Sequence, residues 1–473
     1  MTGLRGRLEA ADRRNLIRVM PAKGAEMSTS ASADVASADV ARADVASPDV
    51  ASADVARPDV ASADVARPDV ASADVARPDV ASADVASPDV LVIGGGVIGL
   101  SIAWRAAQRG MRVTVADPEP GRGASRAAAG MITPISEAAY AEKELFRLGR
   151  ESQRRYPAFA AELTGITSEP TGYRQTGTLQ VACDADDLAL LREHQALQES
   201  FGMTVRRLDA RECRREEPML DPSVRGGLLA AEDASVDPRL LTRALLAAAV
   251  MAGADVVRQP AAEILSARGR AAGAVLADGT RILARWVVLA AGWNSGSVAG
   301  LPPGTAPPVR PVKGQILRLR SLPRGPDSPP GLLARSVRGM VHGSSVYLVP
   351  RQSGELVVGA TQEELGADTR VTAGGVWELL RDARTVVPGI TELELTEAVA
   401  GLRPGTPDNA PVLGPSALPG LVLATGHFRA GVLLAPVTAD IITGYLTTER
   451  LSGLAAPFTP QRFSRPAGAR LWK

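Results

Sequence analysis

The pattern of apolar and polar residues changes character near residue 89. Beyond it, the short β-branched run Asp89–Ile93 is followed by a helix-like segment that extends to about Arg109. The segment Met111–Ala116 then predicts a second strand. The order strand, turn, helix and strand predicts an α/β fold at the start of this region.

A second pattern, with period two, occurs in the C-terminal half of the chain. Val346–Val349 and Glu355–Val358 each have strand-like alternation, and a Gln-Ser-Gly turn lies between them. Two such runs joined by a short glycine-containing turn predict a β-hairpin.

Residues 1–88 follow neither pattern. An aspartate followed by valine recurs every five residues from Asp34 to Asp89, and prolines stand at positions 48, 58, 68, 78 and 88. This period rotates apolar residues around a helix, and each proline removes an amide donor, so no continuous apolar face forms. We expect a disordered low-complexity tail, either without function or with a targeting or spacer role.

A glycine-rich turn, Gly94-x-Gly96-x-x-Gly99, joins the first predicted strand to its helix. Gly94 permits a tight turn, Gly96 lets the backbone approach a pyrophosphate, and Gly99 lets the helix pack closely on the strand. Asp117 follows the second strand, about 20 residues beyond the last glycine of the turn. A carboxylate at this position binds a ribose hydroxyl and disfavours a 2′-phosphate. The unit predicts dinucleotide binding and leaves FAD and NAD open.

Composition excludes several classes of protein. The 473 residues are 45% hydrophobic and 22% charged, which suffices for two domains around a large core. A formal net charge of +1 gives no bias toward nucleic acid. Apolar stretches such as Ala244–Ala252 fall short of the roughly 20 residues that a bilayer requires, so no membrane-spanning helix is expected.

The cysteines and histidines narrow the chemistry further. Only Cys183 and Cys213 are present, which excludes a disulfide scaffold and favours the cytoplasm. The three histidines, His194, His342 and His427, lack the spacing of metal ligands, so no metal site is predicted.

Three further segments carry a family resemblance. Residues 123–131 read Gly-Ala-Ser-Arg-Ala-Ala-Ala-Gly-Met, residues 286–293 read Trp-Val-Val-Leu-Ala-Ala-Gly-Trp, and residues 401–436 contain Gly-Leu-Arg-Pro and Gly-His-Phe-Arg-Ala-Gly. Together they resemble the D-amino-acid oxidase family of flavoproteins, and within it the glycine oxidases of thiamine biosynthesis. The resemblance spans roughly residues 89–446.

This resemblance implies a Rossmann-type FAD-binding domain interleaved with an α+β substrate domain built on a mostly antiparallel sheet. The first comprises residues 89–135, 225–305 and 395–450, the second residues 136–224 and 306–394, and residues 451–473 form a C-terminal extension. FAD is the implied cofactor. Sarcosine oxidases of the family attach flavin through a late cysteine, but none follows Cys213, so FAD is expected to be non-covalent.

The resemblance also implies the residues of the site. Arg403 matches the arginine whose planar fork binds the substrate carboxylate, and Tyr347 matches a tyrosine whose hydroxyl reaches the same group. Arg429 would lie near flavin and substrate, with Met131 in the apolar wall. The cofactor site would comprise Gly94, Gly96, Gly99, Asp117, Ser125, Ala128, Ala129, Gly130, Met131, Ala261, Gly292, Gly426, His427, Phe428, Arg429, Ala430, Gly431, Val432 and Leu433.

Without the resemblance, Arg403 reads as one basic residue among 53 and Tyr347 as an ordinary strand tyrosine. With it, the expected reaction is oxidation of glycine or a similar small amine to an imine, then glyoxylate, ammonia and hydrogen peroxide, with oxygen as acceptor. No catalytic base is required if the amine arrives neutral. The product would serve thiamine thiazole synthesis, and a homo-oligomer is left open.

Three alternatives stay open at this point. The first is a sarcosine or D-amino-acid oxidase or dehydrogenase, because Gln362 and the two glutamates after it could make the pocket more polar. A flavin-binding protein without turnover is the second. An NAD-dependent dehydrogenase is the third, and it gives the glycine-rich C-terminal segment no role.

Overall fold

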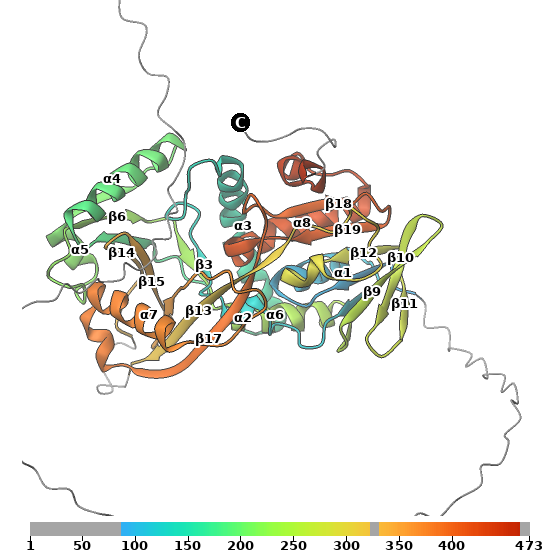
Figure 1. Ribbon diagram of the computed structural model, residues 1–473, viewed down its shortest axis with the longest axis horizontal. Coiled ribbons are helices and arrows are strands. Elements are labelled where there is room, and N and C mark those ends of the chain that lie inside the picture. Colours follow the sequence, from blue (N-terminus) through green and yellow to red (C-terminus); the bar gives the residue numbers. More distant parts are fainter. Residues whose placement is uncertain (1–86, 322–330, 464–473) are drawn as a thin grey trace, which may run out of the picture. The chain divides into compact units, whose positions relative to one another are not determined.

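The computed structural model describes residues 87–321 and 331–463, all within one unit of the chain (Figure 1). The predicted tail, residues 1–88, lies outside the described residues except for 87 and 88. Of the C-terminal extension, residues 464–473 also lie outside them.

The first predicted strand lies inside a six-stranded sheet. The strand order is β18 (Val412–Pro415), β19 (Leu421–Thr425), β12 (Trp286–Leu289), β1 (Val90–Ile93), β2 (Val113–Ala116) and β8 (Asp255–Val257). All neighbours run parallel except β18 and β19. Every residue of β1 is buried, as expected of a parallel strand with both sheet faces covered. The predicted strand, turn, helix and strand over 89–116 are confirmed.

Helices pack beside this sheet through a largely apolar core. The first is α1 (Val97–Gln108), which contacts both α6 (Pro238–Met251) and α8 (Gly431–Thr448). The long helix α3 (Lys143–Thr167) contacts α6 and α8 in turn. The Trp104 side chain is fully buried, and its ring meets the edge of Phe159 at a centroid distance of 5.4 Å. This aromatic contact joins α1 to α3.

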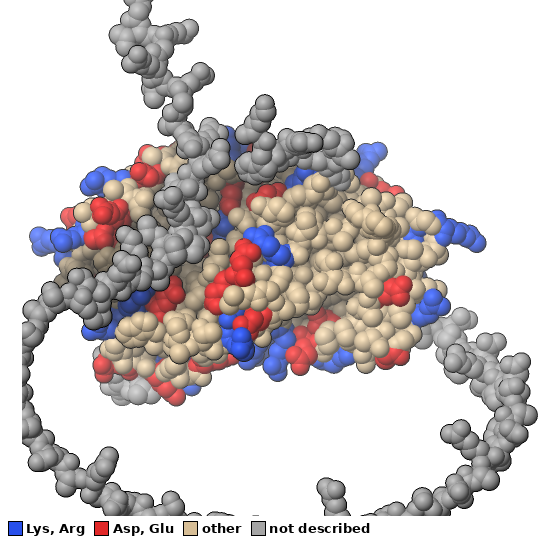
Figure 2. Space-filling view, viewed as in Figure 1, with Lys and Arg blue, Asp and Glu red and all other residues tan. Residues whose placement is uncertain are grey.

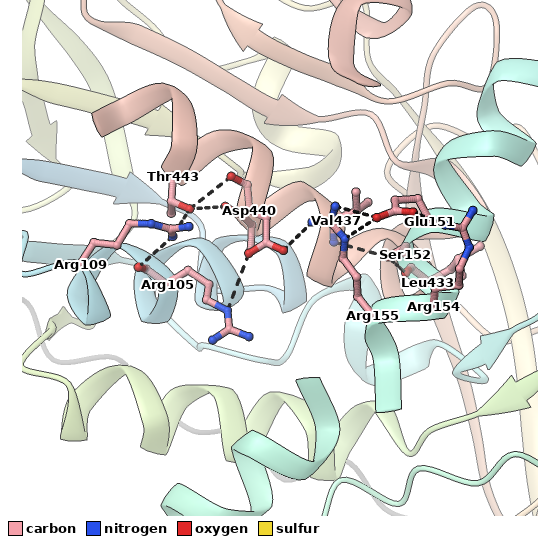
Figure 3. Close-up of polar contacts among 11 residues, drawn as sticks. Arg105, Arg109, Glu151, Ser152, Arg154, Arg155, Leu433, Val437, Asp440 and Thr443 are labelled. Carbon is pink, nitrogen blue, oxygen red and sulfur yellow. Dashed lines mark hydrogen bonds and ion pairs between the residues drawn. The ribbon is translucent and has the colours of Figure 1, made fainter. Parts of the chain in front are cut away.

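Helix α8 needs a separate account, because the segment Phe428–Thr448 has the length and apolar composition of a membrane span. This segment is longer than the apolar stretches from which no membrane-spanning helix was expected. In the structure, 72% of its most apolar 18-residue stretch is buried. Asp440 accepts a 2.6 Å hydrogen bond from Arg155 of α3, and Thr443 contacts Arg109 beside α1 (Figure 3). These contacts fit a core helix of the unit.

The second large sheet has eight strands. Their order is β17 (Glu394–Gly405), β13 (Arg310–Arg320), β16 (Glu355–Gly359), β15 (Ser344–Pro350), β14 (Ser336–Val341), β4 (Thr178–Ala182), β6 (Gly226–Ala230) and β5 (Arg206–Asp209). Only β14 and β4 pair in parallel, so the predicted antiparallel character is confirmed. The predicted hairpin is also confirmed, since β15 and β16 pair antiparallel.

The remaining elements border these two sheets. Helix α7 (Ala373–Val386) packs on β13, β14 and β15, whereas α4 (Ala185–Ser200) and α5 (Ala210–Glu216) contact β6. The short helix α2 (Ala124–Ala127) contacts β17. The small sheets consist of β9 (Ala261–Ala267) with β10 (Arg270–Leu276) and β11 (Arg281–Leu283), and of β3 (Met131–Ile132) with β7 (Ala234–Ser235).

Two strands differ from the predicted segment boundaries. β6, and β17 apart from Glu394, fall within ranges assigned to the cofactor domain, yet both strands pair in the eight-stranded sheet. A strand's sheet is determined by long-range hydrogen bonds, which neighbouring motifs do not reveal. The division into two domains itself stays a prediction.

On the face drawn in Figure 2, acidic and basic side chains are interspersed without a dominant sign.

Candidate active site

One cavity of about 1070 Å³ collects residues from both large sheets. Its volume slightly exceeds the range of roughly 300–1,000 Å³ that small-molecule sites occupy. It begins at the carboxyl end of β1, where ligands bind in open α/β sheets. The predicted residues that line it are Gly94, Gly96, Asp117, Ser125, Ala128, Ala129, Gly130, Met131, Ala261, Gly292, Tyr347, Arg403, His427, Phe428, Arg429, Gly431 and Val432.

Four predicted cofactor residues are not among the lining residues: Gly99, Gly426, Ala430 and Leu433. Leu433 is buried in the helical core instead. Gly426 has a φ of +73°, and an added Cβ would lie 2.5 Å from Thr406 Cγ2. The predicted cofactor site included all of residues 426–433, whereas the backbone turns there and directs only some of these residues toward the cavity.

The outer glycines of the Gly-rich turn are required by the protein's own packing. A Cβ on Gly99 would lie 1.8 Å from the Gly94 carbonyl oxygen. Gly94 has a φ of +106°, and a Cβ there would lie 2.4 Å from the Ala290 oxygen. The tight turn and the close helix packing predicted for these two positions are therefore both present.

The middle glycine has a different environment. A Cβ on Gly96 would meet only Ser125 Oγ, at 3.4 Å, and the residue lines the cavity. Gly292 and Gly431 also line it, and added Cβ atoms there would meet nothing closer than 3.7 Å. Packing within the protein leaves space at these three positions. Close approach of a bound dinucleotide would fill it, so the residues present fit such a cofactor.

The start of α1 is arranged for an anion. Gly96 precedes the helix and offers no side-chain cap. Ser125 supplies one from a distant segment, since its Oγ accepts a 3.0 Å hydrogen bond from the Val97 amide. Neighbouring amides of the first turn remain available to a phosphate, which a helix N-terminus favours.

Asp117 follows β2 and lines the cavity as predicted. Its Oδ2 accepts a 2.6 Å hydrogen bond from the Gly95 backbone amide, and its Oδ1 accepts one of 2.8 Å from the Glu119 backbone amide. The carboxylate thus ties the Gly-rich turn to the second strand. Each oxygen has a further lone pair, which a ribose hydroxyl could use.

His427 occupies the C-terminal wall of the cavity and is buried. Its Nε2 lies 3.1 Å from Thr438 Oγ1. Burial lowers the pKa of His427 to about 3, so the ring is neutral at physiological pH. The residue serves as an uncharged polar contact next to the start of α8.

Arg403 and Tyr347 lie on the wall formed by the eight-stranded sheet. Arg403 Nη1 donates hydrogen bonds to the carbonyls of Lys313, at 3.3 Å, and Thr361, at 3.1 Å. Its guanidinium lies over Gly314, where a Cβ would be 2.2 Å away. Among residues 87–321 and 331–463, no carboxylate lies close enough to Arg403 to form an ion pair with it. Its charge is therefore left for an anionic ligand.

The Tyr347 ring crosses Gly359, where an added Cβ would lie 2.5 Å from the phenol oxygen. Burial raises the pKa of Tyr347, and the nearby Arg403 guanidinium opposes that rise. The hydroxyl consequently stays protonated and can donate a hydrogen bond. Met131 packs in the same apolar cluster as Tyr347, as expected of a residue in the wall.

Arg429 also lines the cavity, but its guanidinium has a partner that sequence reasoning missed. Nη2 lies 2.5 Å from the Glu142 carboxylate. A second missed pair, Glu137 with Arg338, lines the cavity as well. The hairpin of β14 and β15 could have indicated Arg338, because it stands directly opposite Tyr347.

Neither cysteine lines the cavity. Cys213 is buried, and Cys183 is partly buried. Burial raises the pKa of the Cys183 thiol to about 12 and that of Cys213 to about 11. Their positions and low thiolate content support non-covalent binding of the cofactor.

Comparison with known proteins agrees with this geometry. Residues 89–445 match the family described as FAD dependent oxidoreductase, DAO. The chain belongs to this family. Its members use FAD, which fits the glycine turn, the acidic residue and the cavity described above.

The relatives are consistent with one another. The chain is 34% identical over 380 residues to the bifunctional protein ThiO/ThiG of Trichormus variabilis, covering 80% of this chain and 55% of that protein. It is 32% identical to the glycine oxidase of Bacillus licheniformis, covering 75% and 92%. The crystal structure of glycine oxidase from Geobacillus kaustophilus superimposes with a TM-score of 0.72 at 32% identity, covering 79% and 98%. The chain thus spans about half the length of the bifunctional relative.

Proposed function

We propose that the protein oxidises glycine, or a similar small amino acid, by hydride removal from the carbon beside the amine. The observation that carries this proposal is the Arg403 guanidinium, which lines the cavity and has no carboxylate partner among the described residues. A planar fork of this kind binds a carboxylate through two parallel hydrogen bonds.

FAD would be held mainly by the six-stranded sheet and its loops. The Gly-rich turn and the start of α1 would bind the pyrophosphate, and Asp117 a ribose. Ala128, Ala129 and the segment from His427 to Val432 would border the flavin. When bound, the cofactor supplies acceptance of a hydride and transfer of the electrons to oxygen.

The protein's own contribution is to bind and orient the substrate. Arg403 and the Tyr347 hydroxyl would fix its carboxylate, while Met131 would exclude water from the reacting carbon. Arg429 is paired with Glu142, which favours a role at the border of the site over direct charge pairing with substrate. Glycine, oxygen and water would then give glyoxylate, ammonia and hydrogen peroxide through the imine.

Glycine is preferred because glycine oxidases are among the relatives by sequence and by structure. The bifunctional relative supports a role in supplying thiamine thiazole synthesis. We further propose a cytoplasmic location, from the two unpaired cysteines, and two interleaved domains divided by the two large sheets. A homo-oligomer is compatible with these proposals and unnecessary for the site.

Peroxide release from a substrate panel tests the proposal. Purified flavin-loaded protein would be given glycine, sarcosine, D-alanine and D-proline in air. We expect glycine to give the largest kcat/KM. A larger value for sarcosine or a D-amino acid would replace glycine as substrate but keep the carboxylate anchor. No peroxide and no loss of flavin absorbance with any of the four would contradict the proposal.

A further inference from the structure

In addition to Arg403, the cavity wall contains an ion pair of Glu137 and Arg338. Glu137 comes from the segment between β3 and α3, and Arg338 comes from β14. Arg338 Nη1 lies 2.5 Å from Glu137 Oε1, and each side chain is only 19% exposed. Both residues line the cavity, so this pair is part of its wall.

The position of the pair follows from strand register. Arg338 stands directly opposite Tyr347 in the antiparallel pair of β14 and β15. Opposite residues point to the same sheet face, with Cβ atoms roughly 4.5–5.5 Å apart. Burial has the largest effect on the pKa of Tyr347 and raises it. The charges of Arg403 and Arg338 lower this pKa, and that of Glu137 raises it, as expected of charged groups near the hydroxyl. The carboxylate anchor and the ion pair therefore both lie close to this tyrosine.

This arrangement complements both ends of an amino acid. A substrate whose carboxylate is held by Arg403 and Tyr347 still carries an amine that needs an acceptor when it leaves water. We propose that Glu137 accepts a hydrogen bond from the substrate amine, and that Arg338 is the positioning residue that holds the Glu137 carboxylate in place. The inference rests on the proposed function and extends it to the amine.

The pairing with Arg338 has a chemical reason. A lone carboxylate beside the amine would favour its charged ammonium form, which cannot release hydride from the neighbouring carbon. Arg338 offsets the negative charge of Glu137. The carboxylate then still accepts a hydrogen bond, but it stabilises the ammonium form of the amine less. Arg338 pairs with Glu137, and the charge of Glu137 adds to the rise that burial causes in the pKa of Tyr347 and of Asp233. Arg403, Arg429 and His194 are charged or titratable residues that share a cavity lining with Glu137.

The test compares two ligands that differ only in the amine. Glycine and propionate are nearly isosteric, and both carry the carboxylate. Glu137→Gln keeps the shape of the side chain and removes its charge. We expect the apparent Kd of glycine in anaerobic flavin reduction to rise at least about tenfold, the lower end for a hydrogen bond to a charged group. The Kd of propionate, followed by the flavin spectrum, should change less than twofold.

A matched control removes a similar ion pair elsewhere. Glu162 lies 2.7 Å from Arg105, and neither residue lines the cavity that Glu137 and Arg338 border. Glu162→Gln should leave both Kd values unchanged. Equal weakening of glycine and propionate by Glu137→Gln, or no weakening of either, would overturn the inference. If glycine does not reduce the wild-type flavin at all, the proposed function fails first, and the inference falls with it.

Arg338→Met supplies an independent readout, also for the case that Glu137→Gln loses flavin. It leaves the Glu137 carboxylate uncompensated beside the amine, which should raise the pKa of the bound amine. The pH dependence of flavin reduction by glycine should then move upward by about one unit, equal to roughly tenfold in the neutral fraction. An unchanged profile, or one that moves downward, would show that the pair is only structural.

Discussion

The two sides of the cavity are built in different ways. The cofactor side depends on the segment from β1 to β3, in which the glycine turn, Asp117 and Ser125 lie within about forty residues. The substrate side joins Arg403 of β17 to Tyr347 of β15 and Arg338 of β14. Local spacing therefore specifies the cofactor side, whereas the substrate side exists only once the strands of the eight-stranded sheet are in register.

The largest expected effect concerns the substrate side. Arg403→Lys keeps the charge and loses the planar fork, and disrupting a partly desolvated carboxylate pair costs roughly 2–5 kcal/mol. We expect the variant to retain its flavin spectrum while kcat/KM for glycine falls at least about 30-fold. Steady-state peroxide assays would measure this.

Simple amines without a carboxylate provide the control for Arg403→Lys, because they do not use the anchor. Their residual turnover should change little. An equal decline for glycine and ethylamine would mean that Arg403 supports the fold or the flavin, and the contrast between the two sides would no longer hold.

Asp117→Ala should act on the cofactor side alone. It removes the acceptor for the Gly95 amide and for a ribose hydroxyl. A hydrogen bond to a charged group is worth about 1.5–3 kcal/mol, so FAD affinity should fall about ten- to hundredfold. Titration of apoprotein with FAD measures this, and kcat at saturating FAD should stay near the wild-type value. Unchanged affinity would remove Asp117 from the cofactor site.

The extent of sequence prediction follows the same contrast. The first strand, helix and second strand were predictable because Gly94, Gly99 and Asp117 report local backbone geometry. The ion pair of Glu137 and Arg338 was missed, since the two residues are 201 positions apart in the sequence and no local pattern indicates that they meet. The same reason explains why the predicted segment boundaries did not group β6 and β17 with the other strands of the eight-stranded sheet.

Two glycines within the turn separate packing from cofactor binding. Gly99→Ala places a Cβ against the Gly94 oxygen, and overpacking of this kind costs about 1–3 kcal/mol. We expect it to lower the thermal stability of the apoprotein. Gly96→Ala should leave apoprotein stability nearly unchanged and weaken FAD binding. If both variants affect apoprotein stability equally, Gly96 is also a packing residue.

Asp233 gives the smallest effect, near the segment that carries Glu137. Burial raises the pKa of Asp233 to about 7, and its carboxylate accepts a 3.3 Å hydrogen bond from the Ser136 amide. Between about pH 4 and pH 7 the Asp233 carboxyl is therefore protonated in the folded protein, whereas in the unfolded chain, with a pKa of about 3.9, it has lost its proton. The stabilising contribution is therefore complete below about pH 4 and is lost as pH rises toward 7.

Asp233→Asn removes this titration. As the pH rises from 5 to 8, the free energy of unfolding of the variant should increase relative to that of the wild type by at least about 1 kcal/mol. Thermal unfolding of the two flavin-loaded proteins at both pH values would show it. A difference that does not depend on pH would mean that Asp233 stays ionised in the folded protein.

Anaerobic flavin reduction by the wild-type protein tests the central claim most directly. Glycine and ethylamine would be added at equal concentrations to flavin-loaded protein, and the flavin absorbance followed over time. Both carry a primary amine, but only glycine carries the carboxylate for Arg403. We predict that glycine bleaches the flavin and that ethylamine does so at least about 30-fold more slowly. Equal rates with the two amines, or no bleaching by glycine, would contradict the account.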